Sequence, residues 1–289
     1  MSAIGFVGLG VMGAPMARHL VKAGHDVTGF DVHAPAVEAF VADGGSGAAS
    51  VVDAVRGVDV VVTMLPNHPQ VEEVAAQVLP ALAPGALFVD MSSIRPETSV
   101  RLAAEGARHG VRVIDAPVSG GQTGAQQATL SIMVGGAEAD VAAARPMLEV
   151  LGVPRHVGGP GAGQVVKAAN QLVVAGTYAL ISEAIVLLEG SSIDPEAALD
   201  VLAGGLAASR ILDLKRESML AREFTPGFRI DLHHKDMAIV LDAARNADVA
   251  LPVTGLVAQL VAAARAMGHG SLDHSALLTV TESLAGHPR

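Results

Sequence analysis

The most constraining feature of this 289-residue chain is a glycine pattern close to its N-terminus. Residues 8–13 read GLGVMG, which is G-x-G-x-x-G, between a strand-like run at 3–7 and a helix-like run that ends at Gly24. In that setting the first glycine permits a tight turn, the second lets a pyrophosphate approach the backbone, and the third lets the helix pack on the strand. N–H groups at the helix start then face the anion. The pattern predicts a dinucleotide site made by Gly8, Leu9, Gly10, Val11, Met12 and Gly13, whereas a bare glycine pattern would be an ordinary turn.

A carboxylate follows at the spacing expected for a ribose contact. Residues 26–30 read as a second strand, and Asp31 stands at its end, 18 positions after Gly13. A carboxylate there accepts hydrogen bonds from the adenosine ribose hydroxyls and repels a 2′-phosphate. The next residues, Val32 and His33, supply no arginine to bind such a phosphate. The sequence therefore favours NAD(H), and NADP(H) stays the alternative.

Strand and helix patterns alternate through the first half of the chain. Continuous apolar runs are typical of parallel strands that are covered on both faces. Such runs occur at 58–64 and 86–90. Further strands are expected at 112–115, 129–134 and 153–157, and helical patterns occur at 69–79, 96–109 and 137–151. Polar turns follow two of the strands, at the edge where open sheets bind ligands. Leu65, Pro66, Asn67 and Ser93 are therefore candidate cofactor residues, although Asn67 and Ser93 would look the same as plain turn or N-cap residues.

The pattern changes after the glycine-rich segment 158–163. Beyond it the strand alternation stops, and helical patterns occur at 161–190, 195–202, 208–222, 228–246, 252–267 and 274–285. We therefore expect an α/β chain with a Rossmann-type dinucleotide-binding domain over 1–161. An all-α domain over 162–289 follows, opened by a long central helix.

Composition excludes several classes of function. The net charge of −10 argues against a nucleic-acid partner. The chain has no cysteine, so it forms no disulfide, which is compatible with a cytoplasmic enzyme. We expect no membrane association, because Tyr178, Ser182 and Glu183 interrupt the apolar run at 171–188 and no Lys or Arg cluster flanks it. The 11 histidines form no H-E-x-x-H motif, so no metal site is expected, and Asp273 before His274 is interpreted as a helix cap.

Three polar residues stand out at the start of the apolar central helix. Lys167, Asn170 and Gln171 are spaced i, i+3 and i+4, so they share one helical face. A buried lysine is costly, and the plain interpretation is a core helix whose first turn still touches water. Upstream, Ser119, Gly120 and Gly121 present consecutive N–H groups that suit a carboxylate, or a flexible loop.

Four separated motifs together resemble the β-hydroxyacid dehydrogenase family, and the resemblance covers nearly the whole chain. They are GFVGLGVMGAPMARHL at 5–20, DAPVSGG at 115–121, GAGQVVKAANQ at 161–171 and GFRIDLHHKD at 227–236. The resemblance implies hydride transfer between a nicotinamide cofactor and a short hydroxy or oxo acid. Decarboxylating family members carry an acid seven places after the lysine, where this chain has Val174, so we expect no decarboxylation.

The resemblance also assigns roles to residues. It implies Lys167 as the catalytic acid and base, with Asn170 as its neighbour that orients the substrate. The substrate would be held by Ser119, Gly120, Gly121, Asn170 and Gln171, and the cofactor would be covered by Phe228 and Lys235 from the second domain. Without the resemblance, Lys235 would be taken as a solvated helix lysine.

Assembly and function class complete the expectations. Family members associate through the second domain, which in this chain is rich in Ala, Val and Leu, so a homo-oligomer, dimer or tetramer, is expected. A catalytically silent dinucleotide-binding regulator is the alternative of another class. Retention of Lys167, Asn170 and the Ser-Gly-Gly loop favours the enzyme.

Overall fold

In the computed structural model the described residues are 1–286, and they form two compact units. The first unit is Met1–Lys167, and the second begins at Ala168. The boundary expected after residue 161 falls at the start of helix α8, Ala162–Gly190, whereas the first compact unit also includes residues 162–167 of that helix.

The first unit is built on one mixed sheet. The nine strands of its described residues are β1 (Ala3–Val7), β2 (Asp26–Phe30), β3 (Ser46–Gly47), β4 (Val60–Thr63), β5 (Leu87–Asp90), β6 (Arg112–Asp115), β7 (Val118–Ser119), β8 (Leu130–Gly135) and β9 (Gly152–Gly158). Their order is β3-β2-β1-β4-β5-β6-β8-β7, with β9 paired to β8. The strands from β3 to β6 pair in parallel, and β8 runs antiparallel to β6 and β7.

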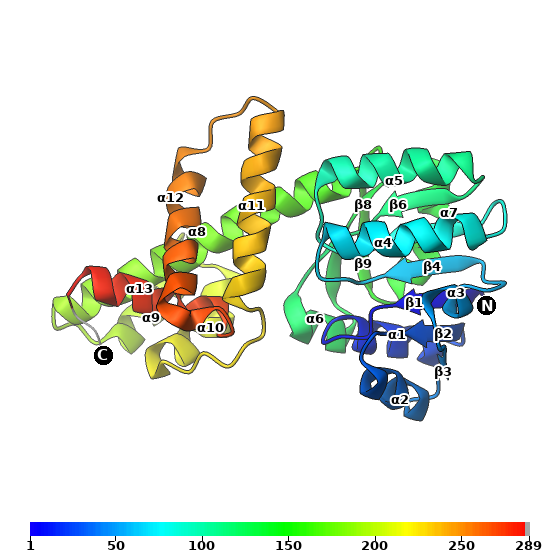
Figure 1. Cartoon of the computed structure of the whole chain (residues 1–289). Coiled ribbons are helices and arrows are strands. Elements are labelled where there is room, and N and C mark those ends of the chain that lie inside the picture. Colours follow the sequence, from blue (N-terminus) through cyan, green and yellow to red (C-terminus); the bar gives the residue numbers. More distant parts are fainter. Residues whose placement is uncertain (287–289) are drawn as a thin grey trace. The chain divides into compact units, whose positions relative to one another are not determined.

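Helices cover both faces of this sheet. One face carries α1 (Gly13–Lys22), α2 (Ala34–Ala42), α6 (Gly121–Gln127) and α7 (Glu138–Glu149), whose Leu20, Phe40, Ala125 and Leu148 share a core with β1 and β8. The other face carries α3 (Val51–Ala54), α4 (His68–Val78) and α5 (Pro96–Arg108), packed through Val51, Val71 and Leu102. Helices α4 and α5 lie beside each other on that face (Figure 1). This doubly covered sheet confirms the predicted Rossmann-type fold.

The second unit is helical, as predicted. It contains the rest of α8 and α9 (Pro195–Ala203), α10 (Arg210–Ala221), α11 (Ile230–Asn246), α12 (Pro252–Ala264) and α13 (Leu277–Leu284). Short turns of other helix types lie at Leu79–Ala81 in the first unit, and at Arg265–His269 and His274–Ala276 in the second. Helices α11 and α12 pack along each other (Figure 1), and Tyr178 and Ile185 of α8 lie in the core.

A buried ion-pair cluster joins three helix ends in this unit. Arg222 follows α10 with a left-handed φ of 57° and donates to Glu189 of α8 and to Glu282 of α13 at 2.8 and 2.6 Å. Only 4% of the Glu282 side chain is exposed, so the guanidinium and not water is its polar partner. The cluster therefore fixes the end of α10 against α8 and α13.

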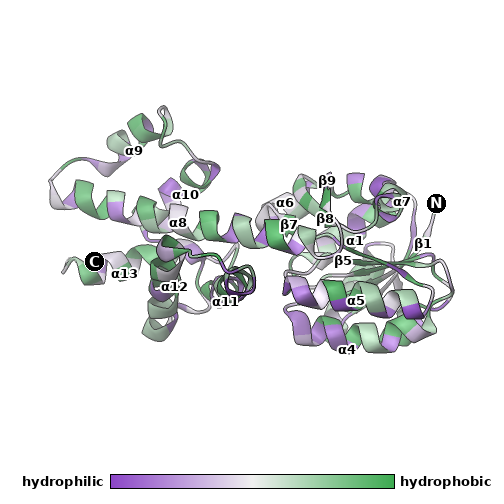
Figure 2. Ribbon diagram, turned by 90° about the horizontal axis from the view of Figure 1, so that it is seen from above, coloured by the Kyte–Doolittle hydropathy of each residue, from purple (hydrophilic) through white to green (hydrophobic). Residues whose placement is uncertain are grey.

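Helix α8 is apolar on its outer side as well as on its core side. By length and composition alone it could cross a membrane, but core helices of soluble proteins pass the same test. Hydrophobic residues recur along it (Figure 2). Val173, Leu180 and Leu187 are 61%, 68% and 70% exposed, and their spacing of seven residues places them on one face.

Candidate active site

The three glycines of segment 8–13 have three different surroundings. A Cβ on Gly8, whose φ is 101°, would stand 2.3 Å from the Met64 carbonyl oxygen. A Cβ on Gly13 would stand 1.9 Å from the Gly8 oxygen, so α1 lies too close to β1 for any side chain there. Gly10 is exposed, and apart from its chain neighbours no atom of residues 1–286 lies within 4 Å of its Cβ position, which leaves its backbone open to a ligand. A tight turn, an open backbone and a closely packed helix N-terminus fit a dinucleotide.

Asp31 is tied to that turn. Its Oδ2 accepts a hydrogen bond from the N–H of Leu9 at 2.7 Å, and its Oδ1 accepts one from the N–H of His33 at 2.8 Å. A carboxylate oxygen can accept two hydrogen bonds, so each oxygen retains capacity for a ribose hydroxyl. The carboxylate is therefore held at the edge of the glycine turn, with its charge partly exposed to solvent.

The turns after β4 and β5 hold the other candidate cofactor residues. Leu65 is half-buried and Pro66 exposed, and Asn67 caps α4, because its Oδ1 accepts from the N–H of His68 at 2.8 Å. Ser93 is half-buried in the turn after β5. The capping bond explains the presence of Asn67 without any ligand. A cofactor role for Asn67 or for Ser93 is therefore a proposal.

Lys167 lies beside the Ser-Gly-Gly segment. The lysine is 8% exposed, and its Nζ donates to the carbonyl oxygen of Val118 at 2.7 Å. Val118 precedes Ser119 on β7, and Gly120 and Gly121 follow with φ of 136° and 60°. The positive φ values at both glycines explain why side chains are absent there. The structure thus brings an ammonium to the three residues predicted to hold a carboxylate.

The sequence left open whether Ser119, Gly120 and Gly121 form a carboxylate cradle or a flexible loop. In the structure Ser119 lies on β7, and residues 121–127 form helix α6, for which the sequence made no prediction. GQTGAQQ has little helix propensity, but Gly124 packs on the Leu130 side chain, 3.2 Å from its Cβ position, and the helix ends at Ala128 with φ of 55°. Tertiary packing outweighs local preference here, and the segment is ordered.

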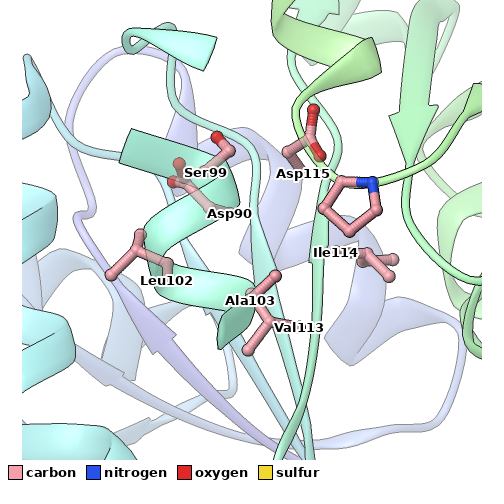
Figure 3. Close-up of a pocket in the computed structure, with 8 residues that line it drawn as sticks. Asp90, Ser99, Leu102, Ala103, Val113, Ile114 and Asp115 are labelled. Atoms are coloured by element: carbon pink, nitrogen blue, oxygen red, sulfur yellow. The ribbon is translucent and has the colours of Figure 1, made fainter. Parts of the chain in front are cut away.

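Two acidic side chains are buried beneath these turns. Asp90 and Asp115 end β5 and β6, pair in register, and are each 2% exposed. Burial raises the pKa of Asp90 to about 6, with a smaller contribution from the charge of Asp115. Burial also raises the pKa of Asp115, opposed by hydrogen bonds from the N–H groups of Gly161, Gln164 and Gly163. Both carboxyls line a narrow hollow with Ser99 (Figure 3), and within residues 1–286 Oδ2 of Asp90 and Oγ of Ser99 have no hydrogen-bond partner.

In the second unit, Asn170 and Gln171 belong to a chain of polar contacts. Asn170 Nδ2 donates to Gln171 Oε1 at 2.8 Å, and Gln171 Nε2 donates to Asp236 Oδ2 at 2.6 Å. Lys235 Nζ lies 2.9 Å from Asp236 Oδ1, so this lysine is ion-paired and 18% exposed rather than solvated. Asp236, which sequence analysis missed, orients the Gln171 amide, and Gln171 in turn accepts from Asn170. The position of Asp236 directly after Lys235 in GFRIDLHHKD was the available signal.

Phe228 belongs to an aromatic cluster in the same unit. Its ring centroid lies 5.8 Å from that of His233 and 5.2 Å from that of His274, and the Tyr178 ring lies 4.0 Å from the His274 ring, tilted by 47°. Asp273 caps the turn at His274–Ala276, as predicted, and accepts from the N–H groups of residues 227 and 228. Burial acts to raise the pKa of Asp273, but His274, Ser275 and Lys215 lower it to about 2. This carboxylate therefore holds the segment that contains Phe228.

The described residues contain no cluster of side chains suited to a metal ion.

Comparison with known proteins places the chain among dehydrogenases. Residues 3–159 match the family profile for the NAD binding domain of 6-phosphogluconate dehydrogenase, and residues 161–281 match the profile for the NAD-binding region of NADP-dependent 3-hydroxyisobutyrate dehydrogenase. The chain is 40% identical to 2-hydroxy-3-oxopropionate reductase of Escherichia coli, over 98% of both chains. It is 38% identical to 2-(hydroxymethyl)glutarate dehydrogenase of Eubacterium barkeri, over 98% of this chain and 96% of that one. A structure of Mycobacterium tuberculosis 3-hydroxyisobutyrate dehydrogenase with L-serine superposes with a TM-score of 0.89 at 37% identity, covering 96% of this chain and 98% of that one.

Proposed function

The chain belongs to the β-hydroxyacid dehydrogenase family, and we propose that it reduces tartronate semialdehyde, 2-hydroxy-3-oxopropionate, to glycerate with NADH. The relative from Escherichia coli supports this substrate. Sequence segments GGLAASRILD at 204–213 and LDHSAL at 272–277 support it too, because they resemble tartronate semialdehyde reductases. Since relatives of similar identity act on other substrates, 3-hydroxyisobutyrate dehydrogenase and glyoxylate or succinic semialdehyde reductase are the alternatives.

The observation that carries the proposal is the buried ammonium of Lys167 beside the Ser119 segment. Hydride delivery to an aldehyde carbon leaves an alkoxide, which a nearby ammonium stabilises and protonates. A lysine can return the proton in the reverse direction, whereas arginine holds its proton too tightly. The N–H groups of Ser119, Gly120 and Gly121 would hold the substrate carboxylate, and Asn170, braced by Gln171, would orient the substrate.

A nicotinamide dinucleotide supplies the hydride when bound. The residues that would hold it are the glycine turn at 8–13, Asp31, the turns containing Asn67 and Ser93, and Phe228 with Lys235. Asp31 supports a preference for NAD(H), because its charge opposes a 2′-phosphate. The family binds NAD or NADP, so the preference is part of the proposal.

Steady-state kinetics with four aldehydes tests the function: tartronate, methylmalonate and succinic semialdehydes, and glyoxylate, each with both cofactors. Lys167→Ala should lower kcat by roughly two to four orders of magnitude while NADH affinity stays within a few-fold. Lys167→Arg should fail too, because it keeps the charge but its pKa above about 12 makes it a poor proton donor. Lys22→Ala, an exposed lysine of α1, is the matched control. If Lys167→Ala turns over within a few-fold of wild type, the proton comes from another group and the assignment of Lys167 as the catalytic acid is wrong.

A regulator that binds the dinucleotide without turnover is the alternative of another class. It predicts NADH binding with no oxidation by any of the four aldehydes. The buried lysine supports the enzyme instead, because a binding module has no need to desolvate an ammonium beside a glycine-rich segment.

A second copy of the chain is our proposed partner for α8. Val173, Leu180 and Leu187 would otherwise leave an apolar stripe in water. An isologous contact between two copies covers such a stripe on both at once. The proposal includes a dimer or a tetramer, acting on a small-molecule hydroxy or oxo acid in the cytoplasm.

A further inference from the structure

Gln164 lies one helical turn before Lys167 and is more deeply buried. It is 1% exposed, and the spacing of three residues places both side chains on the same side of α8. A buried carboxamide is costly unless its donor and acceptor are both satisfied. In Gln164 both are: Nε2 donates to the carbonyl oxygen of Ser92 at 2.8 Å, and Oε1 accepts from the N–H of Ile94 at 3.1 Å.

The turn that Gln164 grips is itself fixed to two strands. Ser92 Oγ accepts from the N–H of Leu65 at 2.9 Å, and the N–H of Ser92 donates to Asp90 Oδ1 at 3.1 Å. Ile94 is 1% exposed. The turn at 92–94 therefore cannot shift without breaking these hydrogen bonds. Through its two bonds to Ser92 and Ile94, Gln164 fixes α8 to this turn.

Asp115 supplies a second anchor on the same helical turn. Its carboxylate accepts from the N–H of Gly161 at 2.7 Å and from that of Gln164 at 3.0 Å, which satisfies donors that a helix start leaves open. A Cβ at Gly135 or at Gly163 would stand 2.6 or 2.7 Å from this carboxylate. Both glycines are thus required for α8 to approach β6 and β8 so closely.

We propose that Gln164 is a positioning residue for Lys167. Asp115 sets where α8 begins, and the Gln164 carboxamide sets its rotation about the helix axis. Together they place the ammonium on the Val118 carbonyl. Misplacing a catalytic group by about 1 Å can cost on the order of 100-fold in rate. A rotation of the first turn would displace the tip of the long lysine side chain by more than it moves the backbone.

The kinetic part of this inference rests on the proposed function, so the experiment has a readout that does not. Gln164→Met keeps the length of the side chain and removes both hydrogen bonds. Gln77→Met, on the exposed side of α4, is the matched control, because within residues 1–286 the side chain of that glutamine bonds only to its own helix. Three quantities are measured: kcat across pH, the Kd for NADH, and the rate at which acetic anhydride labels Lys167, read by peptide mass spectrometry.

Gln164→Met should lower kcat about 10- to 100-fold, shift the pH profile, and leave the Kd for NADH within threefold. Lys167 should be labelled at least several-fold faster, while Gln77→Met should match wild type in every readout. A folded Gln164→Met with wild-type kcat, pH profile and labelling overturns the inference. If the wild-type protein reduces none of the aldehydes, the proposed function fails and the labelling rates alone decide the positioning.

Gln164→Glu decides the case in which Gln164→Met does not fold. The introduced carboxyl still accepts from the N–H of Ile94 but, when ionised, repels the Ser92 carbonyl. Its charged neighbours are Asp115, which accepts from the N–H of residue 164, and Lys167 on the same side of α8. Protonation restores the missing donor. Its kcat relative to wild type should therefore rise as the pH falls from 8.5 to 6, and a constant ratio over that range overturns the inference.

Discussion

Replacing Asp90 with asparagine should stabilise the protein above pH 6. The carboxyl ends β5 and is 2% exposed, in a hollow too narrow for water. Its Oδ1 accepts from Thr63 Oγ1 at 2.8 Å and from the N–H of Ser92 at 3.1 Å, and asparagine keeps that acceptor. The new amide replaces Oδ2, which has no partner in residues 1–286, so an uncharged group takes the place of a buried charge in the hollow that Ser99 also lines (Figure 3).

The magnitude follows from the raised pKa of Asp90. A rise from 3.8 to about 6 is about two units, and each unit corresponds to about 1.4 kcal/mol, so ionisation costs the folded state about 3 kcal/mol. Between pH 4 and 6 the native protein binds more protons than the unfolded chain, so its stability falls as the pH rises through that window. The Asp90→Asn substitution removes a cost that is fully present above pH 6 and absent below pH 4. We expect a gain of about 1–3 kcal/mol at pH 8 that shrinks toward zero at pH 4.

Urea denaturation of wild type and Asp90→Asn at pH 5 and pH 8, followed by circular dichroism, measures the difference. Asp26→Asn, at the exposed start of β2, is the control and should change neither value by more than about 0.5 kcal/mol. A gain that is the same at both pH values, or a loss at pH 8, would refute the assignment of this cost to Asp90.

Four further outcomes are expected. The kcat/KM with NADH should exceed that with NADPH because Asp31 opposes the 2′-phosphate, and an NADPH preference would show that this carboxylate was misread. Lys235→Ala should raise the KM for NADH or lower kcat; unchanged kinetics would leave its ion pair a purely structural one. Arg222→Met should cost about 2–4 kcal/mol in urea denaturation, because it strands two partly buried glutamates, and a loss below 1 kcal/mol would contradict the role of the cluster. Light scattering should give a dimer or tetramer that Leu180→Lys shifts toward monomer, and a wild-type monomer at micromolar concentration would refute the α8 interface.

The fold was largely predictable because its signals are local. The signal for the dinucleotide-binding unit lies within about 30 residues, as a strand, three glycines, a helix and Asp31 in that order. Such a signal can be recognised from the sequence alone. Strands β3 and β7 have two residues each and carry no periodicity. The antiparallel course of β8 was not predictable either, because an apolar run has no direction.

The candidate site was predictable only where a residue type was out of place. Lys167 on an apolar helix is such a case, whereas Asp236 is separated by 65 residues from Gln171, whose amide it binds. In the sequence Gln164 looks like an ordinary helix residue, and Asp90 looks like an ordinary polar residue at the end of a strand. Their importance lies in burial and in hydrogen bonds to distant backbone groups, which no spacing rule reports.

The close approach of α8 to the sheet also limits how this sequence can diverge. Gly135 and Gly163 face the same Asp115 carboxylate from two different elements, so any side chain at either glycine collides with it. Replacing Asp115 first with a residue of shorter side chain would free that space, but it would remove the acceptor for the N–H groups at the start of α8. The three positions are thus epistatically locked: each single replacement is harmful on the background of the other two. We therefore expect Asp115, Gly135 and Gly163 to resist single substitutions, so that the sequence diverges at other positions.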